Sequence, residues 1–246
     1  MILAVSIGNT NIRAAIGTSN ELKSQTVFYA NNCSIIEQIE ASFGPIWGQV
    51  EGSILASVVP QKTDIIVTAL ANKTGYPVTR VNIKKCGSLN TNAYEGLLGE
   101  DRAVCCYSAL QKFAPPFVVV DFGTATTINV VNTNGELIGG AILPGLLTGI
   151  LALSKNTAQL PSIKDIPKDV PLIGKNTHEN LISGAVNGLS FAVEGFVNKI
   201  TNQYNLNKPK VIATGGHAPV VLPYCQFEYN HEPSLLLEGL LSLGAK

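Results

Sequence analysis

A pattern of strand, polar turn and strand occurs twice in this chain, once at residues 4–12 and again at residues 119–128. Each copy joins an apolar run to a glycine turn that carries hydroxyl or amide side chains, and a second run with strand character follows. Further strands expected at residues 54–59 and 211–214 stand at matching places after the two copies. Because the second copy begins near the middle of the 246 residues, the sequence predicts an α/β chain built from two similar halves.

Helical spacing of apolar residues separates the expected strands. The helical run that starts at Asp101 is expected to link the halves, so we place the N-terminal half at residues 1–112 and the C-terminal half at residues 113–246. Residues 154–175 contain three prolines and little periodicity, which predicts a loop. Asn176 and the glutamate three residues later have the spacing of a capping box. The helices are expected at residues 34–43, 61–73, 101–113, 146–153, 177–200 and 234–243.

The two glycine turns have the composition of phosphate-binding turns. Glycine lets backbone N–H groups approach an anion, and Thr or Asn side chains add donors. Gly8-Asn9-Thr10 supplies these groups in the first copy, and Gly123-Thr124 supplies them in the second. A single turn of this kind is more often an ordinary hairpin, but the repeat with its matched strands favours phosphate binding. Two such turns that face one cleft predict a phosphotransferase.

Other polar residues supply the remaining groups that phosphoryl transfer needs. Asp121 ends a strongly apolar strand, where it has little structural purpose, so we expect it to hold a cation. Asp101 is a candidate for the carboxylate that orients the acceptor hydroxyl, although it fits a helix cap equally well. Gly215 and Gly216 end a strand and leave bare backbone for an adenine or ribose. The three histidines lack metal-ligand spacing and are expected to be structural or surface residues.

Composition excludes several classes of protein. The 17 basic residues equal the 17 acidic residues in number and are scattered, so we expect no nucleic-acid partner. No apolar run approaches the ~20 residues of a membrane span, and the apolar N-terminus lacks a basic segment and is expected to be a strand, not a signal peptide. Five cysteines without CxxC spacing predict neither a disulfide framework nor zinc, and indicate a reduced, cytoplasmic protein. An apolar fraction of 46% with only 14% charged residues predicts burial against a second subunit.

Taken in order, the motifs resemble those of the type III pantothenate kinases. The resemblance implies a duplicated actin-like ATPase (ribonuclease H-like) fold, with two halves flanking a nucleotide cleft, and a cytoplasmic homodimer. It also implies ATP-dependent phosphorylation of pantothenate to 4′-phosphopantothenate, the first step of coenzyme A biosynthesis, with Mg²⁺ and a monovalent cation, K⁺ or NH4⁺. The motifs that carry it lie at residues 6–10, 99–102, 121–127, 139–145, 157–161 and 176–177, and at residues 214–218.

The resemblance also implies a role for individual residues. Asp101 would accept the proton of the acceptor hydroxyl, and Asp121 would hold the monovalent cation. Pantothenate contacts would come from Tyr94, Gly99, Glu100, Asp101, Arg102 and Thr177. ATP contacts would come from Ser6, Gly8, Asn9, Thr10, Asn11, Arg13, Thr124, Gly215 and Gly216.

The chain departs from the family pattern at Ser6, where the family motif has an aspartate. A hydroxyl carries no negative charge, and Mg²⁺ prefers carboxylate and water oxygens, so the metal site is expected to be weakened. Two hypotheses stay open at this point. The chain is either a working pantothenate kinase with an altered metal site, or a catalytically impaired member that acts as a binding, accessory or regulatory protein. The retained acceptor residues, such as Asp101 and Thr177, favour the first.

Overall fold

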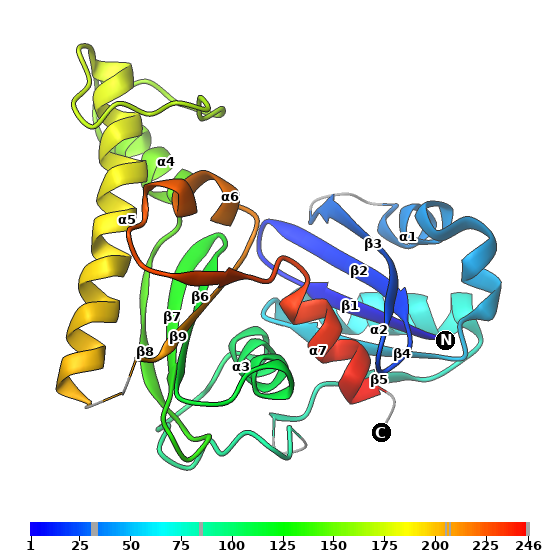
Figure 1. Ribbon diagram of the computed structural model, residues 1–246. Coiled ribbons are helices and arrows are strands. Elements are labelled where there is room, and N and C mark those ends of the chain that lie inside the picture. The colour runs from blue at the N-terminus through cyan, green and yellow to red at the C-terminus, as the bar shows by residue number, and fades with distance from the viewer. Residues whose placement is uncertain (31–33, 84–85, 205, 207, 245–246) are drawn as a thin grey trace. The chain divides into compact units, whose positions relative to one another are not determined.

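A computed structural model describes residues 1–30, 34–83, 86–204, 206 and 208–244. The chain forms two units, each with one five-stranded sheet (Figure 1). The first unit comprises residues 1–90 and 94–112 together with the segment that begins at Ser234. The second unit comprises residues 91–93 and 113–233.

The first unit has a mixed sheet with the strand order β3-β2-β1-β4-β5. The N-terminal strand β1 pairs antiparallel with β2 and parallel with β4, so it occupies the middle of the sheet. The elements of this unit are β1 (Ile2–Ile7), β2 (Asn11–Gly17), β3 (Leu22–Tyr29), α1 (Ile35–Phe43), η1 (Gly44–Gln49), β4 (Gly52–Ser57), α2 (Pro60–Thr74), β5 (Val78–Arg80), α3 (Glu100–Lys112) and α7 (Leu235–Gly244).

The second unit repeats this strand order, read from the other edge as β8-β7-β6-β9-β10. Here β6 is the middle strand, antiparallel to β7 and parallel to β9. The elements are β6 (Phe117–Phe122), β7 (Ala125–Val131), β8 (Leu137–Pro144), α4 (Leu146–Asn156), α5 (Thr177–Gln203), β9 (Lys210–Thr214), α6 (Ala218–Val221), η3 (Leu222–Tyr224) and β10 (Tyr229–His231).

Hydrogen bonds at the strand ends show that the duplication extends to detail. The Ala30 N–H donates to the Thr10 carbonyl at 2.9 Å, and the Gly145 N–H donates to the Thr124 carbonyl at 3.1 Å. Each bond ties the residue after the third strand of its unit to the hairpin turn. The prediction of two similar halves is therefore confirmed, and so is the matching position of the strands that pair in parallel with β1 and β6.

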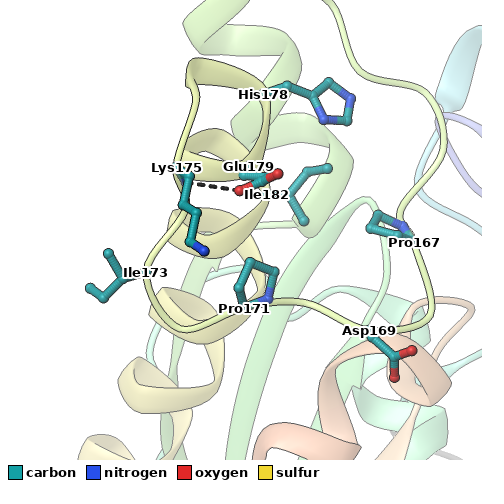
Figure 2. A pocket seen from close by; sticks show the side chains of 8 residues that line it. All are labelled: Pro167, Asp169, Pro171, Ile173, Lys175, His178, Glu179 and Ile182. Carbon is teal, nitrogen blue, oxygen red and sulfur yellow. Dashed lines mark hydrogen bonds between the residues drawn. The ribbon is translucent and has the colours of Figure 1, made fainter.

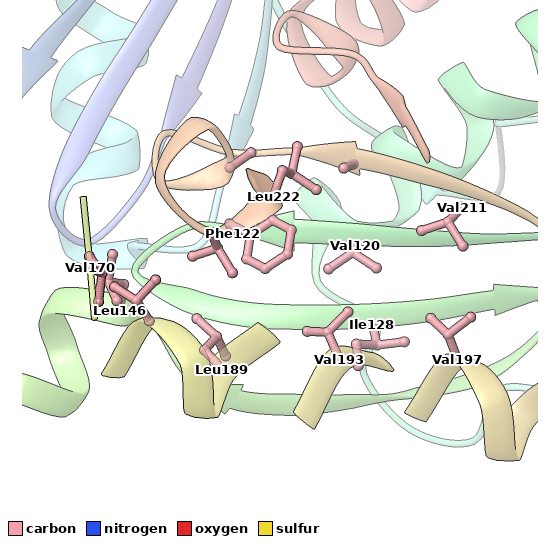
Figure 3. Packing of buried hydrophobic residues seen from close by; sticks show 14 of the residues in the cluster. Val120, Phe122, Ile128, Leu146, Val170, Leu189, Val193, Val197, Val211 and Leu222 are labelled. Atoms are coloured by element: carbon pink, nitrogen blue, oxygen red, sulfur yellow. The ribbon is translucent and has the colours of Figure 1, made fainter. Parts of the chain in front are cut away.

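Each sheet buries one face against helices of its own unit. In the first unit, Leu3, Val5 and Ile7 of β1 pack with Ile39 of α1 and Leu70 of α2. Alternation along a strand places these residues on one face, and that face is covered. In the second unit, Val120, Phe122 and Ile128 pack against Leu189, Val193 and Val197 of the long helix α5 (Figure 3).

The C-terminal helix α7 packs with the first unit, whereas we expected residues 113–246 to form one half. Gly244 at its end lies against the Ile2 and Ile54 side chains, which face away from the α1 and α2 side of the sheet. Gly239 lies against α3, and a Cβ at Gly239 would stand 2.8 Å from Val104 Cγ1. The physical reason for the correction is this apolar face of the first sheet, which the leucines of α7 help to cover.

Local signals placed most helix ends close to where the structure has them. Gly75 ends α2 in the left-handed conformation, with φ of 74°. At the start of α5, Asn176 Oδ1 accepts a hydrogen bond from the Glu179 N–H at 2.9 Å, as the capping box predicts. Residues 157–176 form no helix or strand, in agreement with the expected loop. Within the described part of the chain, no helix combines the length and apolar character needed to cross a membrane.

Candidate active site

The first glycine turn, residues 8–11, is closed by its own backbone. The Gly8 N–H donates to the Asn11 carbonyl at 2.9 Å, and a Cβ at Gly8 would lie only 2.9 Å from that oxygen. Glycine is therefore required here for close packing. Asn9 and Thr10 are exposed at the tip of the turn. Their expected contact with ATP stays a prediction.

Ser6 and Arg13 are direct cross-strand neighbours on β1 and β2. Paired residues point to the same face, so the hydroxyl and the guanidinium share one face of the first sheet. In the second unit, the corresponding pair is Asp121 and Thr127. The pair in the first hairpin therefore carries a cation, Arg13, whereas the pair in the second carries an anion, Asp121, at the position that corresponds to Ser6.

The N-terminus of α3 gathers the residues expected to meet the acceptor. Arg102 Nη1 donates to the Tyr94 hydroxyl at 2.9 Å, and the guanidinium carbon lies 5.4 Å from the centre of the Tyr94 ring. Asp101 Oδ1 accepts a hydrogen bond from the Arg102 N–H at 2.8 Å. A Cβ at Gly99 would stand 2.7 Å from that carboxylate oxygen. Four of the expected residues therefore lie together in one unit.

Glu100 differs from its neighbours in what it contacts. Its carboxylate Oε2 accepts a hydrogen bond from the Ser57 N–H of β4 at 2.8 Å. The expected contact of Glu100 with the substrate stays a prediction. Partial burial raises the pKa of the Glu100 carboxyl above its ordinary value, and the charge of Asp101 adds to this effect. The Ser57 N–H and the charge of Arg80 act in the opposite direction.

The second glycine turn, residues 123–125, is held by more groups than the sequence suggested. Thr148 Oγ1 of α4 donates to the Thr124 carbonyl at 2.6 Å. The His217 N–H donates to the Phe122 carbonyl at 3.0 Å. A Cβ at Gly145 would lie 2.3 Å from the Thr124 carbonyl oxygen, so only glycine fits there. His217 has the structural role expected for it, whereas nothing in the sequence pointed to Thr148.

Asp121 lies beside Thr214 in the parallel register of β6 and β9, which places both side chains on one face. Thr214 Oγ1 is buried and has no hydrogen-bond partner among the residues that the structure describes. Gly215 follows with φ of 98°, and a Cβ there would lie 2.4 Å from Asp121 Oδ1. A buried hydroxyl oxygen beside a carboxylate, with the backbone pressed close, fits a cation with oxygen ligands.

This candidate cation site offers one carboxylate and one hydroxyl, from Asp121 and Thr214. The described residues contain no group of three or more His, Cys, Asp or Glu side chains that could hold a metal ion. A divalent ion that keeps its waters and binds nucleotide phosphates needs only one or two carboxylates, and Asp121 is compatible with that mode.

The N-terminus of α5 borders a pocket of about 520 Å³ within the second unit (Figure 2). Thr177 is exposed at the first position of this helix. Hydrogen bonds from the Lys175 N–H and the Asn176 side chain lower the pKa of the Glu179 carboxyl. The lining residues are Pro167, Asp169, Pro171, Ile173, Lys175, His178, Glu179 and Ile182.

Structural comparisons define the class of protein first. The chain matches a conserved Baf family protein from Campylobacter jejuni with a TM-score of 0.62 and 20% identity, over 98% of this chain and 96% of that one. It matches component A of (R)-2-hydroxyglutaryl-CoA dehydratase from Acidaminococcus fermentans with a TM-score of 0.55 and 12% identity, over 99% and 96%. Together with the duplicated sheets, these likenesses show an actin-like ATPase fold.

Sequence comparisons then identify the family. The model of the family described as type III pantothenate kinase matches residues 2–199. The type III pantothenate kinase of Sulfurihydrogenibium sp. is 34% identical, over 99% of this chain and 99% of that protein. The type III pantothenate kinase of Thermobifida fusca is 32% identical, over 98% and 97%. This chain belongs to the type III pantothenate kinase family.

Proposed function

We propose that this protein transfers the γ-phosphoryl group of ATP to the 4′-hydroxyl of pantothenate and releases ADP and 4′-phosphopantothenate. The observation that carries the proposal is the acceptor group at the start of α3, where Asp101, Arg102 and Tyr94 lie together in a chain that matches the family over nearly its full length. These residues serve the acceptor and not the nucleotide, so they favour pantothenate over another phosphoryl acceptor.

In this proposal Asp101 is the catalytic carboxylate. It accepts a hydrogen bond from the pantothenate hydroxyl and takes its proton as the oxygen bonds to the γ-phosphorus. The bond between that phosphorus and the β,γ-bridging oxygen breaks, and ADP leaves with the electron pair. The hydrogen bond from the Arg102 N–H orients the Asp101 carboxylate. Arg102 in turn is held by the hydroxyl and the ring face of Tyr94.

In this proposal the glycine turns bind the phosphates and the residues beside them bind the cations. We propose that Gly8 to Asn11, Arg13 and Thr124 donate to ATP, and that Gly215 and Gly216 carry the adenosine. Asp121 and Thr214 fit a monovalent cation, K⁺ or NH4⁺, and Mg²⁺ would bind with the nucleotide. Bound cations of this kind neutralise charge on the transferring phosphoryl group. The chain's own contribution is to fix the turns, through Gly145 and Thr148 in the second unit.

In this proposal, Thr177 and the pocket beside it make further contacts with the pantothenate molecule. Lys175 lines this pocket beside the Asp169 and Glu179 carboxylates, and its ammonium group offers a donor for the carboxylate of the substrate. Pro171, Ile173 and Ile182 supply apolar surface for the methyl groups. The capping bond between Asn176 and Glu179 holds the backbone that carries Thr177.

We also propose a homodimer that associates through α5. Gly184, Gly188, Phe191 and Gly195 follow one another at three- or four-residue spacing, so they share one helix face. Phe191 is 51% exposed, and a Cβ at any of the three glycines would meet no atom within 4 Å. This open face suits close approach of a second helix. Sedimentation of the purified protein at micromolar concentration is expected to show a dimer. Gly184→Leu is expected to weaken this dimer. Gly48→Leu, at an exposed glycine of η1, is the control and is expected to leave the dimer unchanged.

The free thiols agree with a cytoplasmic location, where cysteines stay reduced. Among the described cysteines, Cys86, Cys105, Cys106 and Cys225 form no disulfide. Cys33 lies outside the described residues.

A coupled assay of ADP release with ATP, Mg²⁺, K⁺ and pantothenate tests the proposed reaction. Asp101→Asn is expected to lower kcat at least about 100-fold and to leave ATP affinity nearly unchanged, because the amide cannot take the proton. Asp64→Asn is the matched control, since the Asp64 side chain is 84% exposed on α2 and pairs only with Arg80 among the described residues. Activity of the Asp101 variant above about a tenth of the normal rate would exclude Asp101 as the base.

Ser6 decides between the kinase and the impaired, accessory protein. If the protein is a kinase with a weakened metal site, Ser6→Asp restores a carboxylate, lowers the Mg²⁺ concentration for half-maximal rate and raises kcat. In an accessory protein the new charge would repel the phosphates and weaken ATP binding. The two outcomes have opposite signs in a Mg²⁺ titration. We expect the first, since the acceptor residues around Asp101 are retained.

A further inference from the structure

Glu100 contacts β4 at a point where the neighbouring strand β5 has already ended. β5 stops at Arg80, and the Val81 N–H makes the last bond of this ladder, to the Leu55 carbonyl at 2.9 Å. On the other edge of β4, the Val58 N–H donates to the Ile7 carbonyl. Because N–H groups alternate between the two edges of a strand, the Ser57 N–H points toward the edge where β5 has ended. The Glu100 carboxylate takes the place of the missing strand partner at 2.8 Å.

The strand end that Glu100 contacts is itself fixed. Ser57 Oγ lies 2.7 Å from Thr63 Oγ1 of α2 and accepts a hydrogen bond from the Val59 N–H at 3.1 Å. Thr63 Oγ1 also lies 2.9 Å from the Val59 carbonyl. The end of β4 and the start of α2 therefore form one hydrogen-bonded corner. A side chain that binds this corner is tied to the middle of the first sheet.

Glu100 is also the residue immediately before Asp101, in the first turn of α3. That turn lacks intrahelical partners for its first N–H groups, and helix ends fray unless other groups hold them. The Ala103 N–H donates to the Gly99 carbonyl at 3.1 Å, which closes the turn but does not attach it to the sheet. The bond from Ser57 to Glu100 makes that attachment.

We propose that Glu100 is a positioning residue that fastens the first turn of α3 to the end of β4 and so sets where the Asp101 carboxylate points. This inference rests on the proposed pantothenate kinase function. It gives Glu100 a task other than substrate contact, and the task depends on reach and hydrogen-bond acceptance, not on charge. A displacement of about 1 Å at a catalytic group can lower the rate on the order of 100-fold.

Three substitutions of Glu100 test whether the length of its side chain or its negative charge is required. Glu100→Ala removes the acceptor, and kcat is expected to fall about 10- to 100-fold while the KM for ATP changes little. Glu100→Asp keeps the charge but shortens the side chain by one methylene, so it is expected to resemble Glu100→Ala. Glu100→Gln keeps the reach and one acceptor oxygen, and is expected to rescue kcat to within about threefold of the unchanged protein.

Glu194→Ala is the matched control for this series. Glu194 Oε1 likewise accepts a backbone N–H, from Gln226 at 2.5 Å, but it belongs to the second unit and has no catalytic neighbour. Its loss is expected to leave kcat unchanged. If Glu100→Ala behaves like Glu194→Ala, or if Glu100→Gln loses as much activity as Glu100→Ala, the positioning role is refuted.

Hydrogen exchange of the Ser57 amide tests the role of Glu100 independently of the proposed reaction. The Ser57 amide is expected to exchange faster in Glu100→Ala and Glu100→Asp than in the unchanged protein and in Glu100→Gln. This readout does not require turnover. If the unchanged protein fails to phosphorylate pantothenate, the proposed function fails whatever the exchange shows. If turnover is present and the Ser57 amide exchanges equally in all forms, the anchor is wrong and the function stands.

Discussion

Gly215→Ala tests the backbone packing at the end of β9 most directly. The residue has φ of 98°, and an added Cβ would lie 2.4 Å from Asp121 Oδ1 and 2.5 Å from the Phe122 carbonyl carbon. A Cβ in this part of φ/ψ space costs about 1–2 kcal/mol. Moving the crowded atoms costs about 1–3 kcal/mol more. We therefore expect the free energy of unfolding to fall by roughly 2–5 kcal/mol.

Scanning calorimetry measures this effect. For a chain of this length, 1 kcal/mol shifts the Tm by about 2–4 °C, so the variant should melt roughly 4–20 °C lower. Gly149→Ala in α4 is the matched control, because a Cβ there comes no closer than 3.8 Å to Pro144 Cβ. Alanine in a helix interior is favoured by up to about 1 kcal/mol, so this control should melt slightly higher. A Gly215 variant that melts within about 2 °C of the unchanged protein would refute the reasoning.

Three further predictions concern titration, thiols and capping. Burial raises the folded-state pKa of the Glu100 carboxyl, so its contribution to stability is full below the unfolded pKa and is lost as pH rises through the folded pKa. In urea unfolding, Glu100→Gln should therefore gain stability relative to the unchanged protein as pH rises above the unfolded pKa of the glutamate, and a constant difference would contradict this. Burial raises the pKa of the Cys106 and Cys225 thiols to about 12. In a Cys33→Ser variant, a thiol reagent at pH 8 should therefore label almost no cysteine before denaturation and four cysteines after it. Rapid labelling of the native protein would show that these cysteines are accessible. Asn176→Ala removes the cap of α5 and should cost about 1 kcal/mol in a thermal melt, and an unchanged Tm would mean that the cap contributes nothing.

Elements with strong local signals were predictable from the sequence. The two hairpins combine apolar alternation with a glycine turn, and these features are set by residues close in the chain. Gly75 and Asn176 mark a helix end and a helix start through backbone conformation and capping, which also act locally. The family resemblance placed Tyr94, Asp101 and Arg102 in one site, and the structure brings these three residues together, whereas their contact with the acceptor stays a prediction.

Features that depend on distant contacts were not predictable in the same way. The membership of α7 in the first unit depends on how its leucines fit an apolar sheet face far away in sequence. Glu100 lies in the expected acceptor motif, yet its partner Ser57 is found only once β5 is known to end at Arg80. Thr148 supports the second turn through one hydroxyl on a helix, which leaves no pattern in the sequence.

The packing of α7 in the first unit has a consequence for biosynthesis. Ribosomes add about 5–20 residues per second, so the roughly 120 residues between Lys112 and Ser234 take on the order of 6–24 s to translate. During that interval the nascent first unit has all of its strands, but the helix that contacts Ile2 and Ile54 has not been made. The second unit has every described element before this helix emerges. The N-terminal unit therefore receives its last helix only after every residue of the second unit has been synthesised.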